Sequence, residues 1–197
     1  MSPVLRYLEN IYGEKLQSII NKYLFMNKIA IMFGPENGSV HRVAKLLASK
    51  IDTQKPDLIL VNKASASDLS RYDIIIFGIS TIGRDTWDQK FGNVDWAQFM
   101  PTVSSFDFTG KKVAVFGLGD HITYAYHFVN SMGILAKTVL KNGAQLIGKV
   151  SPESYTFQDS EALESSMFLG LPIDEDFEPE LTEERLNGWV ELLNQEF

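Results

Sequence analysis

The spacing of hydrophobic positions along the chain changes near residue 27. Before that point, apolar side chains recur at helical steps through residues 3–25, which is typical of one face of an amphipathic helix. The residues on this face are Leu8, Ile11, Tyr12, Leu16, Ile19, Ile20 and Tyr23. We therefore expect residues 1–25 to form a helical extension, interrupted near Gly13, that packs on a domain made by residues 26–197.

From residue 28 onward, short apolar runs alternate with helical patterns. The runs are rich in Ile, Val, Leu and Phe, which is typical of strands buried on both faces of a parallel sheet. They span residues 28–33, 57–61, 73–79, 112–117 and 144–150. Helical spacing is found in residues 40–51, 124–141 and 186–197. We expect Thr182 to cap the last of these helices. The alternation predicts an α/β fold, with a doubly wound five-stranded parallel sheet in a three-layer sandwich.

Residues 150–181 follow neither the helical nor the strand period. An irregular loop of this length is uncommon in a compact domain, so we expect an insertion with some structure of its own. Within it, residues 168–171 read Phe-Leu-Gly-Leu and predict a short edge strand.

Composition limits the classes of function. The 197 residues include 45% hydrophobic and 12% aromatic residues, enough for a buried core, and the formal charge is −7. That charge argues against a nucleic-acid binder. The absence of cysteine and the presence of only three histidines argue against a metal site. No apolar run reaches the length of a membrane span, so the sequence predicts a cytoplasmic protein without membrane contact.

The charge is concentrated in the last quarter of the chain. Residues 151–197 carry one basic and 13 acidic residues, whereas residues 27–150 carry 14 basic and 10 acidic residues. This acidic block is either a solvated surface or a docking face for basic partners.

Three loops follow predicted strands, at the edge where an open parallel sheet binds ligands. In residues 34–39, backbone N–H groups at a helix start suit a phosphate monoester, although a simple Asn-Gly turn is an equal alternative. Residues 78–93 begin with small and hydroxylated side chains that let a planar ligand approach. Residues 117–124 resemble a dinucleotide fingerprint but have Ile122 in place of its third glycine. Tyr124, expected at a helix start, either stacks on a ring or packs on the protein.

From about residue 27 to the C-terminus, the chain resembles the flavodoxins, with residues 150–181 similar to the insertion of the long-chain branch. The resemblance is carried by IAIMFG, YDIIIFG, KKVAVFGLGDHITYAYHFVNSMG and FLGLPIDEDFEPELTEERLNGWVELLNQEF. It implies one bound FMN and low-potential, one-electron transfer between a reductase and an acceptor enzyme, with a monomeric protein expected.

The resemblance also implies which residues hold the cofactor. Those around the phosphate are Glu36, Asn37, Gly38, Ser39 and Val40. Those along the two edges of the flavin ring are Ser80, Thr81, Ile82, Gly83, Leu118, Gly119, Asp120, Tyr124 and His127. Acidic residues near the ring, the candidates for partner docking, are Asp85, Asp88, Asp95 and Asp120.

Several positions depart from the family pattern. Three hydroxyl residues of the phosphate loop are replaced by Pro35, Asn37 and Val40. Ile82 stands where an aromatic residue usually stacks on the flavin, and we expect Trp87, in the lengthened loop, to replace it. Tyr126 and Thr123 occupy positions that are usually acidic and glycine, respectively.

Two other classes of function remain open from the sequence. One is a flavodoxin-fold enzyme that passes two electrons from NAD(P)H to a quinone-type acceptor, although the sequence contains no evident nicotinamide site. The other is a non-redox binding module that has lost FMN. The sequence contains no catalytic nucleophile or acid–base pair, which an electron carrier does not need.

Overall fold

A computed structural model of the chain describes residues 27–81 and 94–197. The predicted helical extension, residues 1–25, lies outside the described residues. So does the part of the second loop that contains Trp87. Within the two described ranges, no helix has both the length and the apolar character that crossing a membrane requires.

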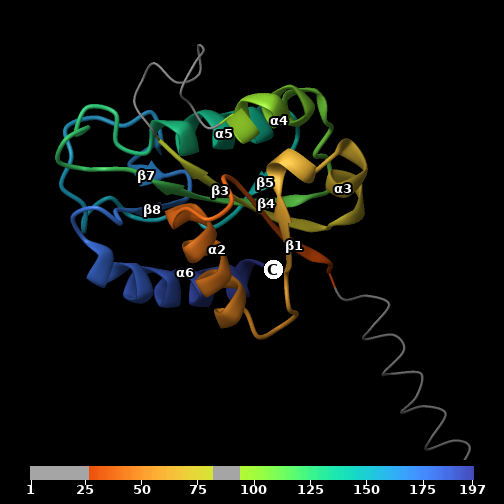
Figure 1. Ribbon diagram of the computed structural model, residues 1–197, viewed down its shortest axis with the longest axis horizontal. Coiled ribbons are helices and arrows are strands. Elements are labelled where there is room, and N and C mark those ends of the chain that lie inside the picture. The colour runs from red at the N-terminus through yellow and green to blue at the C-terminus, as the bar shows by residue number, and fades with distance from the viewer. Residues whose placement is uncertain (1–26, 82–93) are drawn as a thin grey trace, which may run out of the picture.

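Five parallel strands of the central sheet, as predicted, follow the order β2-β1-β3-β4-β5, and a sixth strand, β8 (Leu171–Ile173), pairs with β4 (Figure 1). The five strands are β1 (Ile29–Phe33), β2 (Asp57–Leu60), β3 (Ile74–Ser80), β4 (Lys112–Leu118) and β5 (Gln145–Leu146). The last strand is shorter than the predicted run 144–150. Gly148 adopts a φ of 73°, which turns the chain away from the sheet. Its N–H donates a hydrogen bond of 2.6 Å to the Glu196 carboxylate.

Helices cover both faces of the sheet, which makes the three-layer sandwich (Figure 1). One face carries α2 (Ser39–Lys50) and α6 (Thr182–Glu196), and the other carries α3 (Ala66–Arg71), α4 (Val94–Ser105) and α5 (Asn130–Lys141). The sequence analysis did not identify α3 or α4. Six residues are too few to show a helical period in α3, and Pro101 interrupts the pattern of α4.

Alternating side chains of the central strands feed two separate cores. Ile75 and Phe77 of β3 pack with Val115 of β4 on the side of α4 and α5. Their chain neighbours, such as Ile76 and Phe116, pack on the side of α2 and α6. This two-sided burial explains why the strands are nearly continuous apolar runs in the sequence.

The insertion forms three short strands. Strands β6 (Leu163–Glu164) and β7 (Met167–Phe168) make an antiparallel pair, and β8 (Leu171–Ile173) pairs in parallel with the carboxyl half of β4. The predicted single strand over residues 168–171 was therefore wrong. Gly170 separates β7 from β8 and passes so close to β4 that an added Cβ would lie 2.1 Å from the carbonyl oxygen of Val115.

Two predicted helix starts were also wrong. Thr182 is the first residue of α6 rather than its cap, and its hydroxyl donates a hydrogen bond to Glu175. Helix α5 begins at Asn130 rather than at Tyr124, because Val129 adopts a left-handed conformation with a φ of 49° that no helix interior accepts. The residues before it form turns.

Two glycines inside helices provide a matched test of this packing. Gly188 in α6 has open space around it, whereas a Cβ on Gly133 in α5 would lie 2.5 Å from backbone atoms of Glu161 and Ala162 in the insertion. We expect Gly188→Ala to stabilise the protein by about 0.5–1 kcal/mol, because alanine reduces the entropy of the unfolded chain. We expect Gly133→Ala to destabilise it by about 1–3 kcal/mol. Urea unfolding of both variants checks the difference, and equal effects would contradict the close contact between α5 and the insertion.

Candidate functional site

A cavity of about 340 Å³ lies at the carboxyl ends of β1, β3 and β4. This is where an open parallel sheet places its ligands. Its walls come from the start of α2, the end of β3, the loop after β4 and the loop after β8. The lining residues are Pro35, Gly38, Ser39, Val40, Ser80, Thr81, Leu118, Gly119, Asp120, Tyr124, Glu175 and Asp176.

Most of the described residues that the sequence pointed to come together at this cavity. Three do not line it, namely Glu36, Asn37 and His127, and their contact with a cofactor stays a prediction. Three others, Ile82, Gly83 and Trp87, lie outside the described residues. Asp85 and Asp88 of the predicted docking set also lie outside them, and Asp95 does not line the cavity.

The sequence analysis placed Pro35 in the phosphate loop without counting it among the cofactor residues, and it did not point to Glu175 or Asp176 at all. The two acidic residues belong to the acidic block, and that block was the one signal in the sequence that pointed to them. Their position depends on the pairing of β8 with β4, which no local pattern reveals.

The first wall is the start of α2, which has the properties of an anion site. Gly38 precedes the helix in an extended conformation, no side chain caps the helix, and its first turn contains no acidic residue. The first N–H groups of a helix have no carbonyl partner within it, and the helix dipole makes this end positive. Asn37, with a φ of 65°, donates its N–H to His41 Nδ1 at 3.0 Å, which holds the loop before the helix.

The second wall is the end of β3. Thr81 donates its N–H to the carbonyl of Leu118 at 2.8 Å, and its Oγ1 accepts the N–H of Ser131 at 3.0 Å. Thr81 therefore ties β3 to the end of β4 and to the start of α5. These bonds hold the backbone of this wall in place.

The third wall is the loop after β4. Asp120 Oδ1 accepts the N–H groups of Ile122 at 2.9 Å and Thr123 at 2.6 Å, so the chain turns at once after the strand. In such a turn the aspartate side chain accepts the hydrogen bonds that a backbone carbonyl would accept in an ordinary turn. It places Tyr124 on the cavity wall with 45% of its surface exposed, so its ring can contact a planar ligand.

A buried carboxylate joins the loop after β4 to the loop after β8. Asp174 is inaccessible to solvent and accepts hydrogen bonds from the backbone N–H groups of His121, Asp176 and Phe177. The His121 ring contacts the same carboxylate through Nδ1. Burial is the largest influence on the pKa of Asp174 and raises it. The hydrogen bonds together outweigh burial, so the pKa lies below its ordinary value.

The His121 ring is enclosed on its other sides. It meets the rings of Phe128 and Phe177 edge-on, with centroids 6.2 Å away in each case. Its Nε2 lies 4.0 Å from Glu178, which in turn pairs with Arg185 at 2.6 Å. The two loops that carry Tyr124 and Asp176 are therefore held by a continuous set of polar and aromatic contacts.

The cavity has two electrostatically different parts. The start of α2 is positive through its dipole, whereas Asp120, Glu175 and Asp176 add carboxylates to the walls. Leu118, Val40 and the Tyr124 ring add apolar surface. The arrangement suits an elongated ligand that has an anionic group at one end and a planar ring at the other.

The Flavodoxin family model matches residues 31–189. Flavodoxin 1 of Escherichia coli strain K12 is 36% identical over 167 residues, which cover 84% of this chain and 92% of that protein. The flavodoxin of Synechococcus elongatus is 36% identical over 173 residues, covering 87% and 99% of the two chains.

Solved structures agree at the level of the fold. A crystal structure of Fusobacterium nucleatum flavodoxin bound to flavin mononucleotide superposes with a TM-score of 0.78. It has 21% sequence identity and covers 87% of this chain and 99% of that one.

The lowered pKa of Asp174 predicts a pH-dependent contribution to stability. A carboxylate whose pKa is lowered by folding stabilises the protein above its ordinary pKa, and the contribution is lost as pH falls through the folded-state value. We expect Asp174→Asn to reduce the free energy of unfolding by about 2–4 kcal/mol at pH 7, because its donors lose a charged acceptor. The penalty should shrink in acid, as urea unfolding at neutral and acidic pH will measure.

Asp176→Asn is the matched control, because its side chain lies on the cavity wall two residues away and is exposed. It should change stability at neutral pH by no more than about 0.5 kcal/mol. Equal effects of the two substitutions, or a penalty for Asp174→Asn that does not change with pH, would refute the structural role of Asp174.

Proposed function

The chain belongs to the flavodoxin family, and we propose that it is an electron carrier that binds one FMN in the cavity described above. The observation that carries the proposal is the cavity itself, where the uncapped start of α2 and the Tyr124 ring lie on different walls of the same cavity. A cytoplasmic, monomeric carrier that serves a reductase and an acceptor enzyme is part of the proposal.

The residues present fit FMN. Backbone N–H groups at Gly38, Ser39 and Val40 would hold the phosphate, since the first turn of α2 offers unpaired donors. Ser80 and Thr81 would line one edge of the ring system. The end of β4 and the loop after it would line the other edge, through Leu118, Gly119, Asp120 and Tyr124. Glu36, Asn37, Ile82, Gly83, Trp87 and His127 complete the proposed set.

The bound flavin supplies the redox chemistry, accepting and releasing electrons singly. The chain determines how readily it is reduced. Asp120, Glu175 and Asp176 each oppose the addition of negative charge inside the cavity, which favours a low reduction potential. The apolar surface of Leu118 and Tyr124 limits access of water, so this opposition is less screened than in solvent.

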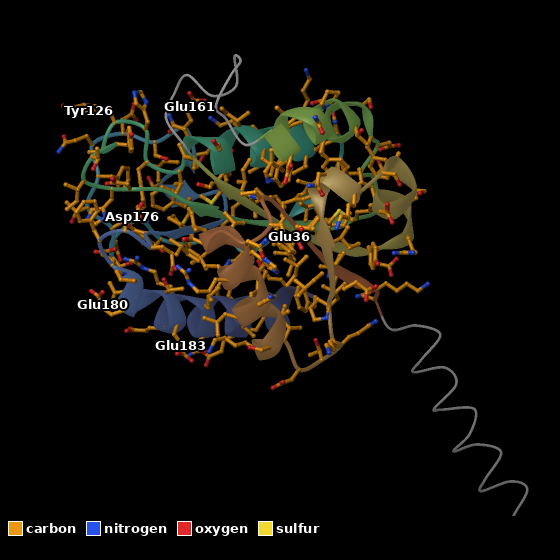
Figure 2. The ribbon with its side chains drawn as sticks, in the orientation of Figure 1. Glu36, Tyr126, Glu161, Asp176, Glu180 and Glu183 are labelled. Atoms are coloured by element: carbon orange, nitrogen blue, oxygen red, sulfur yellow. The ribbon has the colours of Figure 1, made fainter. Side chains whose placement is uncertain are left out.

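The two loops that carry Tyr124 and Asp176 have the character of a docking face. Tyr126 and Phe177 are exposed large side chains of the same two loops that carry Tyr124 and Asp176. Figure 2 shows Tyr126, Asp176 and Glu180 along one side of the molecule. Apolar side chains beside carboxylates suit a partner protein with a basic rim around an apolar centre.

The first test is a titration of flavin-free protein with FMN. We expect binding to saturate at one equivalent at micromolar concentration, with quenching of flavin fluorescence, and stepwise potentiometry should resolve two one-electron reductions. Tyr124→Leu should weaken binding about tenfold, because the stacked ring is lost. Failure of the wild-type protein to bind FMN would exclude the carrier.

Tyr126→Leu is the control, because Tyr126 is 67% exposed and does not line the cavity. It should leave the affinity for FMN unchanged. Oxidation of NAD(P)H by the loaded protein in the presence of a quinone would instead identify a reductase.

The second test concerns docking by charge. Cytochrome c, a small basic haem protein, serves as the probe acceptor for the reduced, FMN-loaded protein. We expect the bimolecular rate of electron transfer to fall severalfold as salt is raised, because charge attraction is screened. Asp176→Lys should lower the rate at low salt more than Glu191→Lys, an equal charge change on an exposed residue of α6. Equal effects would place docking elsewhere.

A further inference from the structure

The phosphate end of the cavity is poor in side-chain donors. Pro35 and Val40 cannot donate hydrogen bonds from their side chains, and Ser39 provides the one hydroxyl among the described lining residues of this wall. None of the described residues that line the cavity is a lysine or an arginine, whereas three are carboxylates. Among the described lining residues, the two negative charges of a phosphate monoester would therefore meet three carboxylates, and the helix dipole would be the source of positive potential on the wall itself.

Arg42 is the cation next to this wall. It lies on the first turn of α2, where its N–H bonds to the carbonyl of Gly38 at 3.1 Å. Its Nη2 lies 3.3 Å from Oγ of Ser39, a cavity residue. The side chain is 64% exposed, so it has room to change direction.

Arg42 is also held by a carboxylate of the cavity wall. Its Nε donates to Glu175 Oε2 at 3.1 Å, and its Nη2 contacts the same oxygen. The Glu175 side chain is only 7% exposed and accepts a further hydrogen bond from the Thr182 hydroxyl. Glu175 is thus the buried, held member of the pair, and Arg42 is the exposed member.

We propose that Arg42 supplies the positive charge with which this cavity binds a phosphate monoester, and that Glu175 competes with the phosphate for that charge. The inference rests on the proposed function, because it concerns the phosphate of FMN. Arg42 bridges Ser39 and Glu175, so a small rotation of its exposed side chain transfers the guanidinium from the carboxylate to the phosphate end. A planar guanidinium also forms paired hydrogen bonds with phosphate oxygens.

The two members of the pair therefore have opposite effects on affinity. Removal of the Arg42 charge weakens the binding of the phosphate. Neutralisation of Glu175 strengthens it, because the competing anion is gone and the acidity of the wall is reduced. Riboflavin, which has the same ring system without the phosphate, should respond to neither change.

The experiment compares FMN with riboflavin on the flavin-free full-length protein. Dissociation constants come from quenching of flavin fluorescence for wild type, Arg42→Gln, Glu175→Gln and the double variant. We expect Arg42→Gln to raise the Kd for FMN about three- to tenfold, within the range of partly exposed charge pairs. Glu175→Gln should lower it, and its amide oxygen can still accept the Thr182 hydrogen bond. The Kd for riboflavin should stay within about twofold of wild type in both variants.

Lys45→Gln is the matched control. Lys45 lies one turn further along α2, is exposed and does not line the cavity, so the same loss of charge should leave the affinity for FMN nearly unchanged. A second measure is the dependence of the Kd for FMN on salt, which should be weaker in Arg42→Gln than in Lys45→Gln.

The outcomes separate the two proposals. If wild-type protein binds FMN and Arg42→Gln changes the affinity for FMN and riboflavin equally, Arg42 has a structural role and the inference is wrong. The inference is equally wrong if Arg42→Gln and Lys45→Gln have the same effect. If wild-type protein binds riboflavin with the same Kd as FMN, the phosphate site itself is refuted. Failure to bind either flavin overturns the proposed function together with the inference.

Discussion

The buried carboxylate of Asp174 is the constraint on which the site depends. An inaccessible charge is tolerated only when hydrogen-bond donors surround it, and here the donors come from both loops of the cavity wall. His121 belongs to the loop after β4, and Phe177 belongs to the loop after β8. The requirement to satisfy one carboxylate therefore fixes two segments that are far apart in sequence. Gly119 adds a second connection, with its N–H donated to the carbonyl of Ile173 at 3.0 Å.

This connection explains what the insertion contributes to the cavity. Strand β8 runs parallel to β4, so its carboxyl end lies at the same edge of the sheet as the ends of β3 and β4. The residues that follow β8 are Asp174, Glu175 and Asp176, and this pairing brings Glu175 and Asp176 to the cavity wall. Without the pairing of β8, the loop after β4 would lose its carboxylate partner and the cavity would lose one wall.

The sequence predicted the features that depend on local patterns. Buried parallel strands are largely apolar, so the five strands β1 to β5 were found, and the carboxyl ends of those strands located the loops of the site. The predicted start of α5 was wrong because Val129 adopts a left-handed conformation just before the helix, and the predicted role of Thr182 was wrong because its hydroxyl has another partner. Thr182 binds Glu175 instead of capping a helix. Glu175 and Asp176 were missed because a two- or three-residue strand gives no periodic signal.

The acidity of the chain takes on a more specific meaning in the structure. Net charge affects general properties of a protein, such as its binding to polyanions. The effect of an individual carboxylate depends on where that carboxylate lies in the structure. Asp174 is used internally, where its charge orders two loops. Glu175 faces Arg42 at the positive end of α2, and Asp176 lies on the exposed wall. Within this one run of three acidic residues, Asp174 serves stability, whereas we propose that Glu175 affects cofactor affinity and that Asp176 belongs to the surface offered to a partner. This division follows from burial. The energy of a buried carboxylate depends on its hydrogen-bond donors, whereas the energy of an exposed carboxylate depends mainly on solvent.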